Sequence, residues 1–191
     1  MRHDLFPLPI YEFENEQAKE QQKTLVDLFK NVESQIEMKN YYSMGGYTSY
    51  GSIQHILEYD ELEPIKKFIQ EKINTVLEDL NLIGYANFSG SWFNINRKNS
   101  IHESHNHIPD TLSGIYYVQA DVNDAKIHFI DNNKISNWPW RSSNNNLTKH
   151  DIGFEPHTGK LYIFPSYAQH YVAQQTNDNE RVSISFNTFL S

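Results

Sequence analysis

The chain has 191 residues, of which 38% are hydrophobic and 14% aromatic, a composition typical of a folded protein with one hydrophobic core. Its net charge of −8 and its lack of a basic stripe argue against nucleic acid as the main partner. The sequence has no cysteine, which excludes disulfides and thiolate metal sites, so any metal must be bound by His, Asp or Glu. No segment resembles a signal peptide or a membrane span, and we expect a cytoplasmic protein.

The first half of the chain predicts two helices. Apolar residues recur at helical spacing over 15–39, with Asn15 as a plausible N-cap, and a second apolar stripe predicts a helix over 61–80. The prolines of 5–13 predict an extended segment at an edge. The paired glycines of 40–51 predict a loop between the helices.

From residue 84 onward the apolar pattern changes to a period of two, which indicates β-strands separated by polar turns. Helices followed by at least six short strands predict a mainly β fold, an antiparallel barrel or jelly roll with the helices packed on one outer face. We find no internal repeat and expect a single domain over 1–191. In it, 1–83 would form the extended segment and buttressing helices and 84–191 the β core. The strand-like segments are YANFSGSWFNIN, LSGIYYVQA, KIHFI, KLYIFPS, HYVAQ and RVSISFNTFL.

A long polar segment, residues 131–151, interrupts the strands. It is rich in asparagine, and Trp138 and Trp140 are its main apolar side chains. We expect it to be a mobile lid or a loop folded over a site.

The segment HESHNH contains three histidines within six residues. In an extended chain, residues i and i+2 point to the same side, so His105 and His107 can share one metal ion. Two nitrogens do not complete a metal site. His170, at the start of the later strand-like HYVAQ, is the best candidate for a third ligand.

The other histidines have structural interpretations that need no metal. We expect His102 to be a solvated neighbour and His128 to lie on the outward face of its strand. No role is assigned to His3, His55, His150 or His157.

Alternation in RVSISFN places Arg181 and Ser183 on a polar face, opposite an apolar face that can pack under the helices. A buried arginine without a partner is costly, and its planar fork suits a carboxylate ligand. The alternative is a salt bridge from Arg181 to Glu155 or Glu180. In the strand LSGIYYV, Tyr117 shares a face with Ser113 and Ile115, so its phenol can enter the same cavity.

The segments HNHIPDTLSGIYYV, PHTGKLYIFPSYAQH and ERVSISFN, in this order, resemble the iron(II)/2-oxoglutarate oxygenases of the double-stranded β-helix (cupin-like) fold. The similarity is greatest to a bacterial and phage branch and covers roughly residues 88–189. It implies iron binding by His105 and His170, with His107 where most of the superfamily has Asp or Glu. It also implies binding of the distal carboxylate of 2-oxoglutarate by Arg181, with support from Ser183 and Tyr117.

Because the sequence has histidine at position 107 where most of the superfamily has Asp or Glu, the identity of the third metal ligand stays open. Three neutral histidines make a more cationic site than two histidines and a carboxylate. Asp110 is a second candidate for the third ligand, although the turn after Pro109 is expected to carry it away. The site could also bind metal without using 2-oxoglutarate.

The resemblance thus implies an iron(II)- and 2-oxoglutarate-dependent dioxygenase, expected to be a hydroxylase. The rival hypotheses are a non-catalytic jelly-roll module and a three-histidine dioxygenase that does not use 2-oxoglutarate. An anion-binding Arg181 near the metal favours the first. The substrate is left open among a free amino acid, a protein side chain, a nucleobase and a small metabolite, and the oligomeric state, including a homodimer, is open as well.

Overall fold

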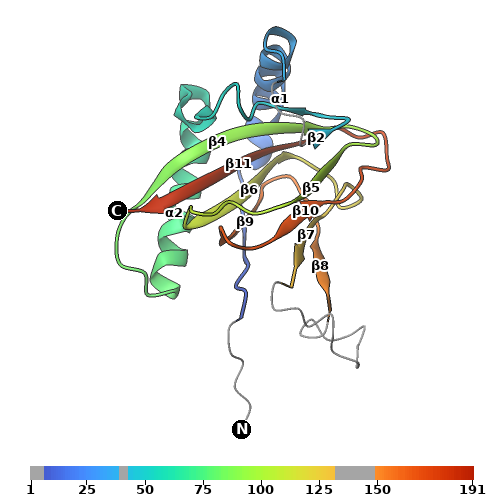
Figure 1. Ribbon diagram of the computed structural model, residues 1–191. Coiled ribbons are helices and arrows are strands. Elements are labelled where there is room, and N and C mark those ends of the chain that lie inside the picture. The colour runs from blue at the N-terminus through green and yellow to red at the C-terminus, as the bar shows by residue number, and fades with distance from the viewer. Residues whose placement is uncertain (1–6, 39–42, 132–148) are drawn as a thin grey trace.

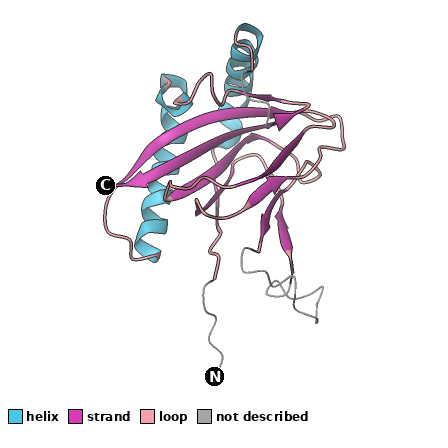
Figure 2. Ribbon diagram, in the orientation of Figure 1, coloured by secondary structure: helices cyan, strands magenta, loops and turns pink. Residues whose placement is uncertain are grey.

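A computed structural model of the chain describes residues 7–38, 43–131 and 149–191. Two antiparallel sheets face one another, with two α-helices to one side (Figures 1 and 2). The helices are α1 (Ala18–Gln35) and α2 (Glu63–Asp79), and both precede the long strand β4 (Ala86–Asn96). The other strands are β1 (Tyr11–Glu14), β2 (Ser43–Met44), β3 (Tyr47–Thr48), β5 (Ile101–His105), β6 (Leu112–Gln119), β7 (Ile127–Ile130), β8 (Asp151–Phe154), β9 (Lys160–Pro165), β10 (His170–Val172) and β11 (Arg181–Leu190).

The six-stranded sheet has the order β1-β9-β6-β11-β4-β3, and the helices cover its outer face. The apolar stripes of both helices pack on this face in one buried cluster, which includes Phe29 of α1 and Ile69 of α2. The outward side chains of β11, among them Val182 and Ile184, belong to the same cluster. The predicted jelly-roll arrangement with helices on one outer face is therefore confirmed.

The five-stranded sheet has the order β2-β5-β10-β7-β8 and lies against the inner face of the larger sheet. A second, smaller apolar cluster, including Ile115, Ile127, Phe129 and Phe164, fills part of the space between the sheets. The predicted site residues His105, His170 and Arg181 line the remaining space, where the inner faces of β4 and β11 meet the ends of β5 and β10.

Several predicted boundaries shift. Both helices are shorter than expected. Asn15 lies in a tight turn before α1, where its Oδ1 accepts a hydrogen bond from the backbone N–H of Gln17 at 3.1 Å. The expected loop 40–51 contains the two-residue strands β2 and β3, and β8 begins at Asp151. The central part of the expected lid, including Trp138 and Trp140, lies outside the described residues.

No helix in the described ranges is long and apolar enough to cross a membrane.

Candidate metal and co-substrate site

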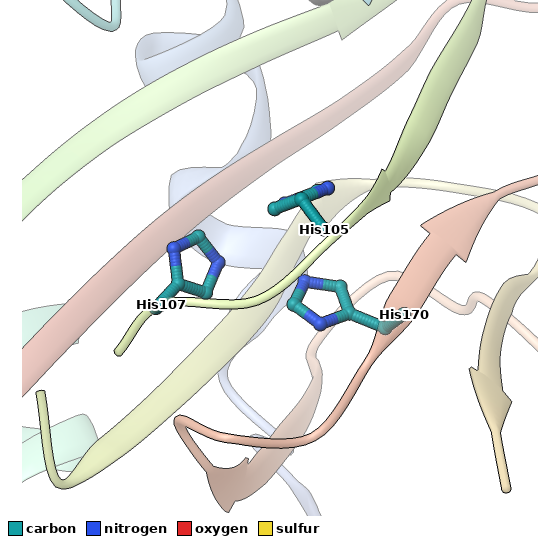
Figure 3. Close-up of side chains that lie close together, drawn as sticks. All are labelled: His105, His107 and His170. Carbon is teal, nitrogen blue, oxygen red and sulfur yellow. The ribbon is translucent and has the colours of Figure 1, made fainter. Parts of the chain in front are cut away.

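His105, His107 and His170 come together at the ends of β5 and β10 (Figure 3). One ligand nitrogen from each ring lies within 4.8 Å of the other two. The ring centroids are separated by 4.4 Å (His105–His170), 5.0 Å (His105–His107) and 5.2 Å (His107–His170). This spacing allows three imidazoles to bind one metal ion, as the sequence predicted.

Backbone contacts fix the orientation of two of these rings. The strands β5 and β10 pair so that His105 lies opposite His170. The Nδ1–H of His105 donates to the carbonyl of Glu103 at 2.7 Å, and that of His170 donates to the carbonyl of Ala168 at 2.8 Å. In both rings Nε2 is left as the metal-binding atom, an arrangement common around bound metals. His107 lies beyond the strand, where its backbone N–H donates to the carbonyl of Ser166 at 2.8 Å.

The site favours neutral imidazoles. Burial, reinforced by the charge of neighbouring histidines, lowers the pKa of His170 to about 3 and that of His107 to about 4. Because a metal binds the neutral imidazole, these rings are in the ligand form at neutral pH.

The expectation that His102 is a solvated neighbour is wrong. The register between β5 and β10 shifts by a bulge: His170 and Val172 are two residues apart, whereas their partners His105 and His102 are three apart. The extra residue turns His102 to the same face as His105, against simple alternation. Its ring lines the space between the sheets, and burial, with help from the charge of Arg181, lowers its pKa to about 3.

Arg181 lies on the floor of this space and is 1% exposed. Its Nη1 donates to Asn96 Oδ1 at 2.8 Å and its Nη2 to the hydroxyl of Tyr117 at 3.3 Å, and the Tyr117 ring lies 4.8 Å from the guanidinium carbon. Its Nε has no hydrogen-bond partner among the described residues. Within the described part of the chain, this fully buried guanidinium therefore has only neutral contacts, a costly arrangement unless an anion binds to it.

The predicted alternative, a salt bridge from Arg181 to Glu155 or Glu180, is wrong. Glu180 pairs with Arg97 at 3.0 Å and with Lys30, and Glu155 pairs with Lys126 at 3.0 Å. Both carboxylates are thus occupied elsewhere.

A cavity of about 50 Å³ joins the arginine to the three histidines. Two further polar atoms of this cavity, Ser183 Oγ and Asn94 Oδ1, are buried and have no hydrogen-bond partner in the part of the chain that the structure describes. Their residues lie opposite each other on β11 and β4. Unsatisfied buried polar atoms are rare in folded proteins, and a group of them around one cavity indicates a polar ligand.

Asp110, the alternative metal ligand, is not part of the histidine cluster. Its carboxylate accepts a hydrogen bond from the hydroxyl of Ser89 at 2.6 Å. His128 is also remote, since its ring stacks on Tyr171 and contacts Asp151 on the other face of the five-stranded sheet.

Comparison with protein families matches residues 90–187, just over half of the chain, to a family described as "Putative 2OG-Fe(II) oxygenase". The chain belongs to this family. It is an oxidoreductase of the iron(II)- and 2-oxoglutarate-dependent class, as the sequence predicted, and this assignment decides against both rival hypotheses. Comparison with curated protein sequences finds no match.

Solved structures share the fold of this oxygenase over nearly its whole length. A Pseudomonas putida prolyl-4-hydroxylase is 12% identical with a TM-score of 0.67, covering 98% of this chain and 96% of that one. HygX from Streptomyces hygroscopicus, with nickel and 2-oxoglutarate bound, is 8% identical with a TM-score of 0.66, covering 96% and 83%. The viral collagen prolyl hydroxylase vCPH from Paramecium Bursaria Chlorella virus-1, a 2-oxoglutarate complex, is 11% identical with a TM-score of 0.61, covering 94% of each chain.

A larger cavity of about 370 Å³ opens beside the histidines of the oxygenase. Trp92, Tyr50 and Asn94 line it, and sequence reasoning missed all three. Alternation in SWFNIN places Trp92 and Asn94 on the same face of β4, so the sequence could have predicted that both point inward. The position of Tyr50 could not be predicted in this way, because Tyr50 lies in the segment expected to be a loop.

Proposed function

We propose that His105, His107 and His170 bind the iron(II) of this oxygenase, and that Arg181 and Ser183 bind the distal carboxylate of 2-oxoglutarate. The observation that carries this proposal is Arg181: its buried guanidinium has only neutral contacts in the described ranges and lies on the wall of the same cavity as the three histidines.

The residues present fit both groups. Three neutral imidazole nitrogens are suitable ligands for a divalent iron. They add no negative charge, so a dianionic co-substrate offsets part of the combined positive charge of the metal and the guanidinium. The free Nε–H of Arg181 and the unpartnered hydroxyl of Ser183 are donors, which is what a carboxylate requires.

Tyr117 supports this anion site in two ways. Its ring lies under the guanidinium, and its oxygen accepts a hydrogen bond from Nη2. Accepting this bond leaves the hydroxyl hydrogen for another acceptor, so the phenol can also donate to the distal carboxylate.

With O₂, iron(II) and 2-oxoglutarate supply an oxidant strong enough to hydroxylate a C–H bond while the co-substrate loses CO₂. The protein's own residues have simpler tasks. The histidines fix the metal at the mouth of the cavity, Arg181 fixes the far end of the co-substrate, and the apolar walls formed by Ile115 and Phe164 limit water.

We propose hydroxylation of a small molecule or a protein side chain as the reaction. Two of the structurally similar proteins are prolyl hydroxylases, one of them a collagen prolyl hydroxylase, which supports hydroxylation on this fold. HygX has been crystallised with nickel and 2-oxoglutarate, which supports a joint metal and co-substrate site on it.

Sequential calorimetric titrations without oxygen test the proposal: manganese(II) first, as a redox-stable substitute, and then 2-oxoglutarate. We expect wild type to bind both, His170→Ala to lose the metal, and Arg181→Ala to bind the metal but lose most of its 2-oxoglutarate affinity. Arg97→Ala, which removes an ion-paired arginine outside both cavities, is the control. Absence of 2-oxoglutarate binding to metal-loaded wild type would contradict the proposal.

A further inference from the structure

The larger cavity has direct access to the proposed metal site. Five residues line both cavities, so a ligand in the larger one contacts the same side chains that surround the metal and co-substrate. A volume of about 370 Å³ lies within the usual range for a small-molecule site. The five shared residues are Trp92, Asn94, His102, His105 and His107.

The two cavities differ in charge. Arg181 lines the smaller cavity only. Among the described residues around the larger cavity there is no Lys or Arg, and Glu103 is the residue with a formal charge at neutral pH. Apart from the metal that the histidines would hold, an anionic group would therefore find no cationic side chain on these walls, whereas a neutral or cationic donor would meet no Lys or Arg.

Asn94 provides an unused hydrogen-bond acceptor at the junction of the cavities. The residue is 3% exposed, and its Nδ2 donates to Ser185 Oγ at 3.1 Å, which fixes the amide. Its Oδ1 is buried and has no partner among the described residues. Leaving a buried acceptor unpaired costs free energy, so a bound ligand that donates to it is favoured.

2-Oxoglutarate cannot fill this role. Its two carboxylates and its ketone are ionised or neutral acceptors, with no N–H or O–H group at neutral pH. The donor that Asn94 Oδ1 requires must come from another molecule, and the larger cavity is where that molecule would bind.

An aromatic pair adds a flat apolar wall next to the same amide. The rings of Tyr50 and Trp92 meet edge to face with centroids 4.9 Å apart, and the Trp92 ring lies 5.8 Å from that of His107. Trp92 is 7% exposed and is held in place by packing, while Tyr50 is 41% exposed at the rim. An apolar portion of a substrate that packs here lies within reach of the metal site.

We propose that Asn94 is a specificity-determining residue. Together with the Tyr50–Trp92 pair it selects substrates that carry a neutral or cationic N–H or O–H donor next to a flat apolar portion, and disfavours anionic ones. This inference rests on the proposed function, because it takes the histidines as the metal site.

Three probes with the same ring and different head groups test this selection: benzamide, a neutral donor; benzylamine, a cationic donor; and benzoate, an anion without a donor. Protein loaded with manganese(II) and saturated with 2-oxoglutarate is mixed with each probe at millimolar concentration. Broadening of the probe's proton resonances by the paramagnetic metal reports binding near the histidines, even when binding is weak. We expect benzamide and benzylamine to bind roughly tenfold more tightly than benzoate.

Variants assign the effect to one side chain. Asn94→Leu keeps the approximate size but removes the acceptor, so the preference for the two donors over benzoate should be lost. Asn94→Asp keeps the shape and adds a charge, so benzylamine should gain over benzamide. Asn87→Leu, at the other end of β4 and not among the residues that line either cavity, is the matched control and should behave as wild type.

The proposal is overturned if none of the probes is broadened by wild type. It is also overturned if the affinity of benzamide relative to benzoate, whose carboxylate can bind the metal directly, is the same in wild type and in Asn94→Leu, because Asn94 Oδ1 would then not recognise the donor. Bound manganese(II) and 2-oxoglutarate are measured on the same samples. If manganese(II) and 2-oxoglutarate are both bound but no probe binds, this inference alone is wrong. If manganese(II) or 2-oxoglutarate does not bind, the proposed function is wrong.

Discussion

Strands β11 and β5 both contribute to the site, but they present their side chains in different ways. Along β11 alternation is unbroken from Arg181 to Asn187 opposite β4, so one face packs under the helices and the other lines the cavity. Along β5 the bulge opposite β10 breaks the alternation, and His102 and His105 share a face although they are three residues apart. On β11, the residues that pack under the helices and the residues that line the cavity therefore lie on opposite faces. On β5, the bulge brings two histidines onto the same face.

Loss of one of the three histidines should have the strongest effect on binding. We expect His170→Ala to weaken manganese(II) or iron(II) binding by at least about 100-fold, because loss of a ligand exceeds the roughly 10- to 100-fold loss for an outer-shell partner. His105→Ala and His107→Ala should do the same. Metal titration by calorimetry measures the effect.

His128→Ala is the control for these three variants, since its ring stacks on Tyr171 away from the cluster. Equal losses in all four variants would show that the cluster is not the metal site.

The outer face of β11 should affect stability and leave binding unchanged. Ile184 is fully buried between Phe93 and Tyr116 in the helix-backed core. We expect Ile184→Ala to lower the free energy of unfolding by about 2–5 kcal/mol, because a cavity remains where the side chain was. Denaturant unfolding measures the change, and metal affinity at a temperature where the variant is folded should equal that of wild type. A large loss of metal affinity there would break the separation between the two faces.

Substitutions on the inner face of β11 should reduce the affinity for 2-oxoglutarate. Arg181→Ala removes a charge-assisted contact of about 1.5–3 kcal/mol, so 2-oxoglutarate affinity should fall about 10- to 100-fold with metal affinity much less affected. Arg181→Lys keeps the charge but loses the planar fork, and should recover only part of the loss. Calorimetry on metal-loaded protein without oxygen measures both, and full recovery in the lysine variant would contradict a role for the fork.

Tyr117→Phe should give the smallest change. It removes one neutral hydroxyl, worth about 0.5–1.5 kcal/mol, and keeps the ring under the guanidinium, so 2-oxoglutarate affinity should fall about two- to tenfold. A loss as large as that of Arg181→Ala would mean that the phenol is the main carboxylate ligand.

The regular parts of the molecule could be predicted from the sequence. Alternation alone assigned Arg181 and Ser183 to the inner face and Val182, Ile184 and Phe186 to the outer face, and both assignments hold. The HxH spacing and the later His170 likewise predicted the three-histidine cluster.

Irregular features could not be predicted in the same way. The position of His102 depends on a β-bulge, which changes the face of a side chain without changing the local residue pattern. The partners of Arg181 depend on which carboxylates are already paired through tertiary contacts, as Glu180 is with Arg97 and Lys30. The Tyr50–Trp92 pair joins a turn to a strand more than 40 residues away, and no short-range pattern specifies such a contact.

We propose that one buried arginine, Arg181, recognises the distal carboxylate of a co-substrate bound next to the three histidines. The most direct test compares 2-oxoglutarate with 2-oxobutanoate, which keeps the keto acid but lacks that carboxylate, in wild type and Arg181→Ala loaded with manganese(II). We expect wild type to favour 2-oxoglutarate about 10- to 100-fold and Arg181→Ala to bind the two acids with nearly equal affinity. Equal affinity of wild type for both acids, or an undiminished preference in Arg181→Ala, would rule out this role of Arg181.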